Sequence, residues 1–283
     1  MLKGIDTSQW QAGLPDATIN ADFIIFKATE GVGFTDPDCA ASYAESKQAG
    51  KLLGVYHFAR PDGNDPISEA RWFYNETKGY HGEAILVLDW ETEPKGNVGW
   101  AKQWLDEVQR LTGGIKPMIY MSSSVANGYD WSPIWNDYAL WVAQYPDYTP
   151  RYNYNSSGIA MPEVNWPYGY AMWQWTSSGI IDGWGGRLDC NEFYGDAVAW
   201  HAFAKGHPEV TVTPPVPPTQ PPIIVVQPPT TPPEPPVVVP DPEPEPEPPV
   251  VVTPPTEPPV SPPVKISFWQ MIINWIAKLF RKG

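Results

Sequence analysis

The sequence predicts an α/β fold: an irregular (β/α) barrel of the TIM type in residues 1–206, followed by a disordered Pro-rich linker and a short C-terminal amphipathic helix. Eight short apolar segments, each four to seven residues long, recur over about 190 residues with helical or loop segments between them. The fourth is apolar almost throughout, which is typical of a strand buried on both faces of a parallel sheet. The predicted strands are Lys3–Asp6, Phe23–Ala28, Leu52–Phe58, Ile85–Glu91, Pro117–Met121, Ala139–Gln144, Gly169–Trp175 and Arg187–Cys190.

Helices are predicted mainly between the second and the fifth strand. Three segments there show helical periodicity and are followed two residues later by glycine, which commonly ends a helix. They are Asp38–Gln48, Ser68–Thr77 and Gly99–Leu111. Later connections are poorer in helix, and residues 147–167 are rich in Tyr, Asn and Pro. We therefore expect loops to join the last strands of the barrel.

A change in composition near His207 marks the end of the barrel. Of the 36 prolines, 25 lie between Pro208 and Pro263. Proline removes a backbone donor and excludes regular helix and central strand, so residues 207–264 are not expected to form a packed core. They are predicted to be an extended linker of the polyproline-II type.

Residues 265–283 combine a narrow polar stripe with a broad apolar face. The polar positions 267, 270, 274, 278 and 281 follow helical spacing, and a helix of this length is too short to cross a bilayer. We expect an interfacial cationic helix that contacts either an anionic membrane or a protein, such as a virion component. The expected contact residues are Trp269, Ile273, Trp275, Ile276, Lys278 and Arg281.

Charge is divided along the same boundaries. Residues 1–206 contain 25 acidic and 14 basic side chains, which gives −11, while residues 207–264 give −7 and residues 265–283 give +4. An acidic domain lacks the basic surface that binds a phosphate backbone, so no nucleic acid partner is expected. No apolar signal-peptide region precedes the first strand, and synthesis in the cytoplasm of a host is expected.

The fourth predicted strand ends in two carboxylates, Asp89 and Glu91. Side chains at positions i and i+2 of a strand point to the same face, so the two acids are expected to share a small volume. Burial and repulsion would separate their pKa values, so that one acid stays protonated while the other is charged, as cleavage of a glycosidic bond requires. An acid pair after a buried strand also fits a Mg²⁺ or Ca²⁺ site or a helix cap.

In a barrel of this type the active site lies at the carboxyl ends of the strands. Asp6 ends the first strand and Asp189 lies in the eighth, so four acids are expected to converge. The same ends carry aromatic rings, which stack on sugar C–H faces, and polar groups that bind sugar hydroxyls. The candidate binding residues are Lys27, Tyr56, Phe58, Arg60, Tyr120, Trp141, Gln144, Trp173, Gln174 and Trp175.

Other reactive side chains are assigned to packing. His57 lies within the third strand and is predicted to be packed rather than to act as a base. Cys39 and Cys190 are too few for a disulfide framework and are expected to be buried thiols. The sequence has no HExxH, P-loop or CxxC motif, so no metal and no cofactor is expected.

Eight segments in a fixed order resemble the family 25 glycoside hydrolases, the N-acetylmuramidases or lysozymes of the Chalaropsis type found in bacteria, fungi and phage endolysins. The resemblance covers about residues 2–200, and each segment is weak alone while the ordered set is specific. The segments are Gly4–Trp10, Phe26–Gly31, Gly54–Phe58, Leu86–Glu91, Pro117–Tyr120, Leu140–Ala143, Trp173–Trp175 and Arg187–Phe193.

The resemblance implies a role for each acid. Glu91 resembles the general acid/base that protonates the leaving sugar oxygen, and Asp89 resembles its partner, which stabilises the transition state or an oxazolinium formed by the substrate's N-acetyl group. Asp6 and Asp189 resemble two further acids that polarise the site. Asp182 is an alternative candidate for the acid of the eighth strand. The Asp-x-Asn-x-Phe pattern around Asp189 favours Asp189. The nucleophile, an enzyme carboxylate or the substrate acetamido group, stays open.

The implied function is hydrolysis of the β-1,4 bond between N-acetylmuramic acid and N-acetylglucosamine in peptidoglycan. The protein would be an endolysin or a virion-associated lysin that acts at the bacterial cell wall after release. It departs from the family in carrying a proline linker and a helix where wall-binding repeats often occur.

Two alternatives compete with a muramidase. A chitinase of the family 18 type also places acid-x-acid after the fourth strand, but its Asp-Gly-x-Asp-x-Asp-x-Glu approach is absent. The other is a non-catalytic wall-binding or structural virion module. Four acids in one cleft disfavour it, because uncompensated carboxylates cost stability.

Overall fold

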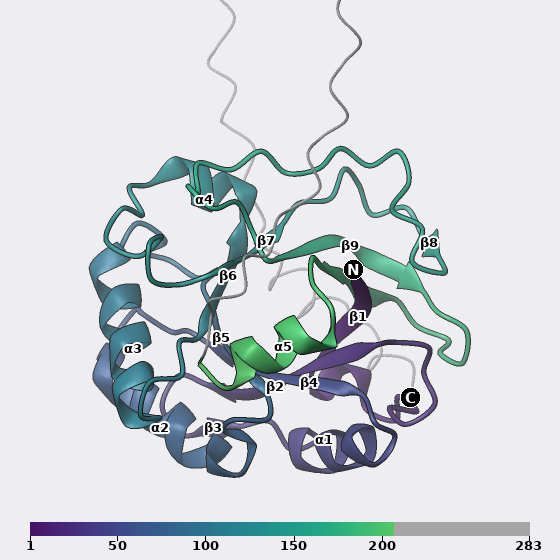
Figure 1. The fold of residues 1–283 in the computed structure, drawn as a ribbon, viewed down its shortest axis with the longest axis horizontal. Helices are drawn as coiled ribbons and strands as arrows, with labels where there is room; N and C mark the ends of the chain where they lie inside the picture. Colours follow the sequence, from purple (N-terminus) through teal and green to yellow (C-terminus); the bar gives the residue numbers. More distant parts are fainter. Residues whose placement is uncertain (207–283) are drawn as a thin grey trace, which may run out of the picture. The chain divides into compact units, whose positions relative to one another are not determined.

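The computed structural model describes residues 1–206, and the predictions for the linker 207–264 and the helix 265–283 lie outside the described residues. Eight strands form a closed barrel in the order β1-β10-β9-β7-β6-β5-β4-β2, and the pairing of β2 with β1 closes it (Figure 1). The prediction of an irregular (β/α) barrel is confirmed. The strands are β1 (Leu2–Thr7), β2 (Phe23–Glu30), β4 (Leu52–Phe58), β5 (Ile85–Asp89), β6 (Met118–Ser122), β7 (Leu140–Ala143), β9 (Met172–Ile180) and β10 (Leu188–Phe193).

The last strand departs from the regular pattern of parallel strands. All other neighbouring pairs of the barrel wall are parallel, whereas β10 is antiparallel to both β9 and β1. Residues 181–187 join β9 to β10 without a helix. A connection this short suits antiparallel strands, because a parallel crossover needs a dozen or more residues.

Three helices lie at the positions predicted from periodicity: α1 (Cys39–Gln48), α2 (Pro66–Thr77) and α3 (Val98–Leu111). Side-chain caps set the first residues of two of them. The Asp65 carboxylate accepts the Ser68 amide at 2.8 Å, and the Asn97 side-chain oxygen accepts the Trp100 amide at 3.2 Å. Not predicted were α4 (Ser123–Gly128), α5 (Ala197–Ala204), the 3₁₀ turns η1 (Gln9–Gln11) and η2 (Lys78–Tyr80), and the two-residue strands β3 (Phe34–Thr35) and β8 (Arg151–Tyr152).

Helix α5 closes one end of the barrel and so leaves the other end for a site. Its Trp200 is fully buried, packs on Phe23 with ring centroids 4.6 Å apart, and donates to the Leu53 carbonyl oxygen at 3.0 Å. Phe23 and Leu53 lie at the beginnings of β2 and β4, so α5 covers the amino-terminal ends of the parallel strands (Figure 1). The carboxyl ends, where the acids were predicted to converge, lie at the opposite end.

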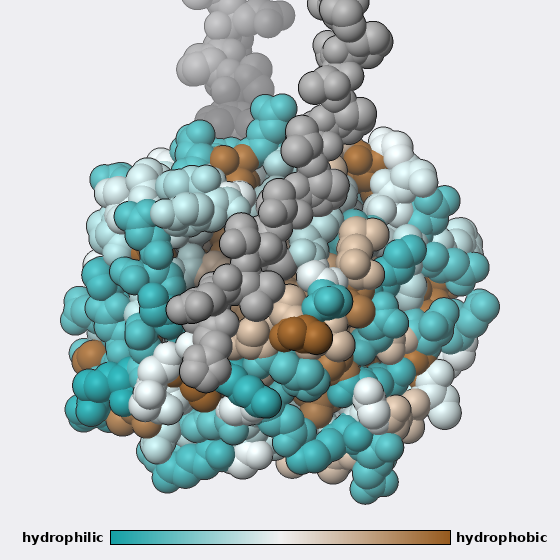
Figure 2. All heavy atoms as spheres, viewed as in Figure 1, coloured by the Kyte–Doolittle hydropathy of each residue, from teal (hydrophilic) through white to brown (hydrophobic). Residues whose placement is uncertain are grey.

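The surface on the α5 side is mostly hydrophilic, with hydrophobic side chains near the centre of the face (Figure 2). Within residues 1–206, every helix is too short or too polar to span a membrane.

Candidate active site

A cavity of about 300 Å³ opens at the carboxyl ends of the parallel strands, and all four predicted acids line it. Asp6 lies near the end of β1, Asp89 is the last residue of β5, and Glu91 follows it two residues later. Asp189 lies near the start of β10, but this strand runs in the opposite direction and pairs Asp189 directly with Asp6. Because β10 is antiparallel, its first residues lie at the carboxyl ends of the parallel strands, and Asp189 lies at the same end of the barrel as Asp6. We refer to this space as the acid cavity.

Six of the ten predicted binding residues also line the acid cavity. Side chains at every second position of a strand share one face. On β5, Ile85, Val87 and Asp89 share the face that points into the barrel, and Ile85 and Val87 fill the interior below Asp89. The six are Lys27, Tyr56, Phe58, Tyr120, Trp141 and Gln174. Gln144 lines an adjoining cavity instead.

Trp173 and Trp175 do not lie at the acid cavity. They flank Gln174 on β9, and their side chains point to the opposite face, where both are buried in the core outside the barrel. The Trp173 indole donates to the Gln144 carbonyl oxygen at 2.9 Å. The expectation that both indoles line the groove is therefore corrected: their role in this structure is packing.

Asp6 is held by two side-chain amides that are themselves fixed by aromatic donors. Its Oδ2 accepts Gln174 Nε2 at 3.0 Å and Asn191 Nδ2 at 2.7 Å. The Tyr120 hydroxyl donates to Gln174 Oε1 at 2.7 Å, and the Trp141 indole donates to Asn191 Oδ1 at 3.0 Å. Each amide is thus oriented with its NH₂ group toward Asp6, and the Asp6 carboxylate is fixed in position.

Burial raises the pKa of Asp6 from 3.8 to about 6, against the opposing effect of the hydrogen bonds from Asn191 and Gln174. A carboxyl group with a raised pKa binds protons more tightly in the folded state, so its contribution to stability falls as the pH rises from about 4 to above 6.

We expect Asp6→Asn to raise the free energy of unfolding at pH 7 and to change it little at pH 4. The uncharged side chain removes the cost of a buried charge and keeps an oxygen to accept an amide. Urea unfolding of both proteins at the two pH values measures the difference. An equal effect at both pH values would mean that Asp6 is not buried as a charge.

The other three acids also have raised pKa values. Burial, and then the charges of Glu91 and Asp6, raise the pKa of Asp89 well above its usual range, and its Oδ1 has no hydrogen-bond partner within residues 1–206. Burial and the charges of Asp6 and Glu91 do the same for Asp189.

Glu91 differs from these acids because its side chain reaches solvent at the mouth of the cavity. The surrounding walls displace much of the water near its carboxyl group, and this desolvation raises its pKa although Lys95, Lys27 and Arg60 act in the opposite direction. An exposed acid with a raised pKa beside buried carboxylates is suited to give a proton to a bound substrate.

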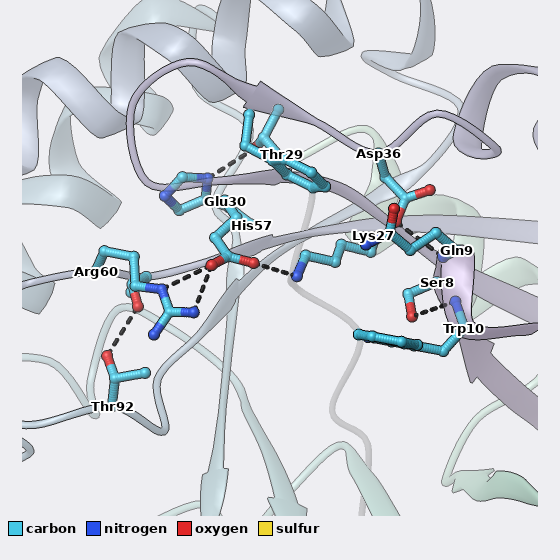
Figure 3. Close-up of polar contacts among 12 residues, drawn as sticks. Ser8, Gln9, Trp10, Lys27, Thr29, Glu30, Asp36, His57, Arg60 and Thr92 are labelled. Carbon is cyan, nitrogen blue, oxygen red and sulfur yellow. Dashed lines mark hydrogen bonds and ion pairs between the residues drawn. The ribbon is translucent and has the colours of Figure 1, made fainter. Parts of the chain in front are cut away.

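Lys27 is held at the cavity wall by an ion-pair chain. Its ammonium pairs with Glu30, which also accepts Arg60 Nε at 2.7 Å, so that Glu30 lies between the two cations (Figure 3). Both cations also lie over the Phe58 ring, at 4.6 Å for Lys27 and 4.7 Å for Arg60. Arg60 does not itself line the acid cavity. It contacts Glu30, which also pairs with Lys27, and its role in binding stays a prediction.

The sequence did not predict several residues of the site. Asn191 lies behind the cavity lining, where it donates to Asp6, and it could have been found because it lies two positions after Asp189 on the same strand face. Trp10 lines the cavity but is 79% exposed, and η1 presents it at the rim, with the Trp10 amide bonded to Ser8 Oγ (Figure 3). Tyr145 follows a predicted strand by one residue, and no sequence signal marks it.

His57 and the two cysteines lie away from the acid cavity. His57 is fully buried between Thr29 and Glu69, at 2.8 Å from each, and burial lowers its pKa. Cys39 and Cys190 are buried free thiols, as expected. No group of three or more His, Cys, Asp or Glu side chains in residues 1–206 is arranged to hold a metal ion.

A closed (β/α) barrel with four carboxylates and aromatic rings around one cavity at its carboxyl end defines a glycoside hydrolase. The sequence model of the glycosyl hydrolases family 25 matches residues 5–184. The chain therefore belongs to the glycoside hydrolase family 25.

Individual relatives agree with this assignment. The uncharacterized protein YegX of Escherichia coli is 32% identical over 72% of this chain and 74% of its own length. Lysozyme M1 of Streptomyces globisporus is 28% identical over 72% of this chain and 71% of its own. These matches give no support to a chitinase of the family 18 type.

Solved structures give the same result. The bacterial lysozyme of Streptomyces coelicolor superimposes with a TM-score of 0.60 at 26% identity, over 73% of this chain and 98% of that one. The CTP1L endolysin superimposes with a TM-score of 0.58 at 27% identity, over 71% of this chain and 69% of that one.

Proposed function

We propose that this protein is a muramidase that hydrolyses the β-1,4 bond between N-acetylmuramic acid and N-acetylglucosamine in peptidoglycan. The observation that carries the proposal is the convergence of Asp6, Asp89, Glu91 and Asp189 on one cavity. Lysozymes among its relatives and an endolysin among its structural neighbours support the choice of substrate.

In this proposal Glu91 protonates the glycosidic oxygen, because it alone of the four acids is exposed at the cavity mouth. The remaining carboxylates favour the positive charge that develops on the sugar ring as the bond breaks. Asp89 lines the acid cavity, and its buried Oδ1 has no partner in the described part of the chain. The phenols of Tyr56 and Tyr120 stay protonated, since burial raises their pKa values well above 10.

Mass spectrometry of the products of purified peptidoglycan tests the proposal. A muramidase leaves N-acetylmuramic acid at the new reducing end, which borohydride reduction labels. N-acetylglucosamine at that end, or no products, would contradict it.

Activity is expected to follow a bell-shaped pH profile with its optimum on the acidic side of neutrality. It should fall as the pH rises because Glu91 must be protonated, and fall at low pH because a neighbouring carboxylate must be charged. The two limbs report pKa values of the coupled cluster rather than of single residues. Initial rates on purified walls measure the profile, and a flat profile from about pH 4 to about pH 9 would remove the carboxylates from the mechanism.

We further propose that the C-terminal segment brings the enzyme to an anionic membrane, with the proline linker leaving the barrel free to reach the wall after release. The support is the sequence of residues 265–283, which has four basic and no acidic side chains. Replacing Trp269, Ile273 and Ile276 by Ser removes large apolar side chains, each worth about 1.5–3 kcal/mol when buried in lipid.

We expect the full chain to sediment with anionic vesicles at low salt and the triple variant to stay in solution. Residues 1–206 alone are the control, and should cleave isolated peptidoglycan as well as the full chain does. Equal and negligible sedimentation of both full-length proteins would exclude the membrane and favour a protein partner.

A further inference from the structure

A second cavity of about 320 Å³ adjoins the acid cavity. The two share Glu91, Tyr120 and Tyr145 in their linings. The proposed proton donor therefore lies where two compartments of one groove meet.

The two compartments differ in charge. Asp6, Asp89 and Asp189 line only the acid cavity. Apart from the shared Glu91, the second cavity has no carboxylate, and its polar lining consists of Lys95, Ser122, Ser123 and Gln144. Hydroxyl, amide and ammonium groups can bind the hydroxyls of a neutral sugar but do not stabilise a developing positive charge.

Lys95 is placed by its backbone and leaves its ammonium available. The Lys95 amide donates to Glu93 Oε2 at 3.0 Å, and the buried Trp90 indole donates to the Lys95 carbonyl oxygen at 2.9 Å. The Lys95 ammonium forms no ion pair with any of residues 1–206, whereas Lys27 in the acid cavity is already paired with Glu30.

We infer that the second cavity binds the sugar on the leaving side of the cleaved bond, and that Lys95 binds a carboxylate carried by the next muramic acid residue. The inference rests on the proposed function. In glycosidic cleavage the acid gives its proton to the oxygen that departs with the leaving sugar, so the acid must lie between the two sugars. The carboxylates that stabilise the positively charged sugar ring line the acid cavity. This cavity therefore binds the sugar on the other side of the cleaved bond.

The chemistry of the glycan places an anion near Lys95. The leaving N-acetylglucosamine is joined to O4 of the next muramic acid, and the lactyl ether of that residue is on the adjoining O3. Where a stem peptide is attached, the lactyl carboxyl group is in amide linkage, so the free carboxylates beside the leaving sugar are those of the stem peptide, and these suit an ammonium group.

Two substrates distinguish the role of the second cavity from that of the acid cavity. The β-fluoride of the N-acetylglucosamine–N-acetylmuramic acid disaccharide has only fluoride as its leaving group, so it needs the acid cavity alone, while glycan strands with stem peptides need both. We expect Ser123→Phe, which fills the second cavity, to lower kcat/KM on strands relative to the fluoride by about tenfold or more. Ser124→Phe, at the exposed neighbouring position outside the cavity lining, is the matched control.

Lys95→Met should raise KM on strands by about threefold, and Lys95→Arg should restore it. The effect should disappear at high salt and on strands whose carboxylates have been converted to amides. Lys102→Met, on α3 and outside both cavity linings, is the control for the lost positive charge. The inference is overturned if Ser123→Phe slows both substrates equally or if Lys95→Met acts equally on native and amidated strands. Wild-type protein that cleaves neither substrate would instead overturn the proposed function itself.

Discussion

Glu91→Gln is expected to lower kcat on purified peptidoglycan by about 10²–10⁴-fold. The amide keeps the size of the side chain but has no proton to give to the leaving oxygen. The environment of Glu91 raises the pKa of its carboxyl group, which favours the protonated form that the variant lacks. Folding should be unaffected because the side chain is exposed at the cavity mouth.

Turbidity loss of purified walls and fluoride release from the disaccharide fluoride together measure the effect. Fluoride departs with little protonation, so the loss on this substrate should be much smaller than the loss on walls. Glu45→Gln removes an exposed carboxylate on α1 and is the control for net charge. Wild-type lysis by Glu91→Gln would falsify the assignment of the acid.

Asp89→Asn is expected to lower turnover by about 10²–10³-fold while raising stability at pH 7. The carboxylate is buried, its pKa is raised well above the usual range, and one of its oxygens has no partner within residues 1–206, so its charge costs folding free energy. The same charge would favour the positive sugar ring in the transition state. Activity and stability should therefore change in opposite directions.

Thermal unfolding and initial rates on the same preparation test this pairing. The exposed Asp62→Asn is the control and should change neither. A destabilised Asp89→Asn protein would mean that the lost rate reflects a damaged fold. A stabilised variant with full activity would show that the Asp89 charge has no catalytic role.

Local sequence patterns predicted much of the fold. The apolar run Ile85–Leu88 becomes the buried strand β5, and Asp89 ends it at the predicted edge. Helices α2 and α3 follow from apolar periodicity and glycine stops, because these signals act within one or two turns of chain, whereas α1 has almost no apolar periodicity and is marked by its glycine stop. The helices that were missed, α4 and α5, are six and eight residues long and carry little periodicity.

Errors arose where a result depended on more distant parts of the chain. Trp173, Gln174 and Trp175 are equally good candidates for sugar binding in the sequence, because each is aromatic or polar. Only one face of β9 points into the barrel, however, and only Gln174 lies on it. Which face points inward is fixed by the register with β7 and β10, and a shift of one residue would exchange them. The sequence also offers no sign that Arg60 pairs with Glu30, since this contact depends on the alignment of β2 and β4.

The sequence by itself determined that this is a barrel with acids at the ends of its strands, and the ordered motifs determined its family. Only the tertiary structure decided which side chains share a cavity, that Glu91 lines both compartments, and that burial raises the pKa values of its neighbouring acids. The physical reason is closure: β1 pairs with both β2 and β10, which brings Asp6 beside Asp189 although the chain separates them by most of the barrel. Desolvation of a carboxylate depends on everything packed around it, and no local pattern contains that information.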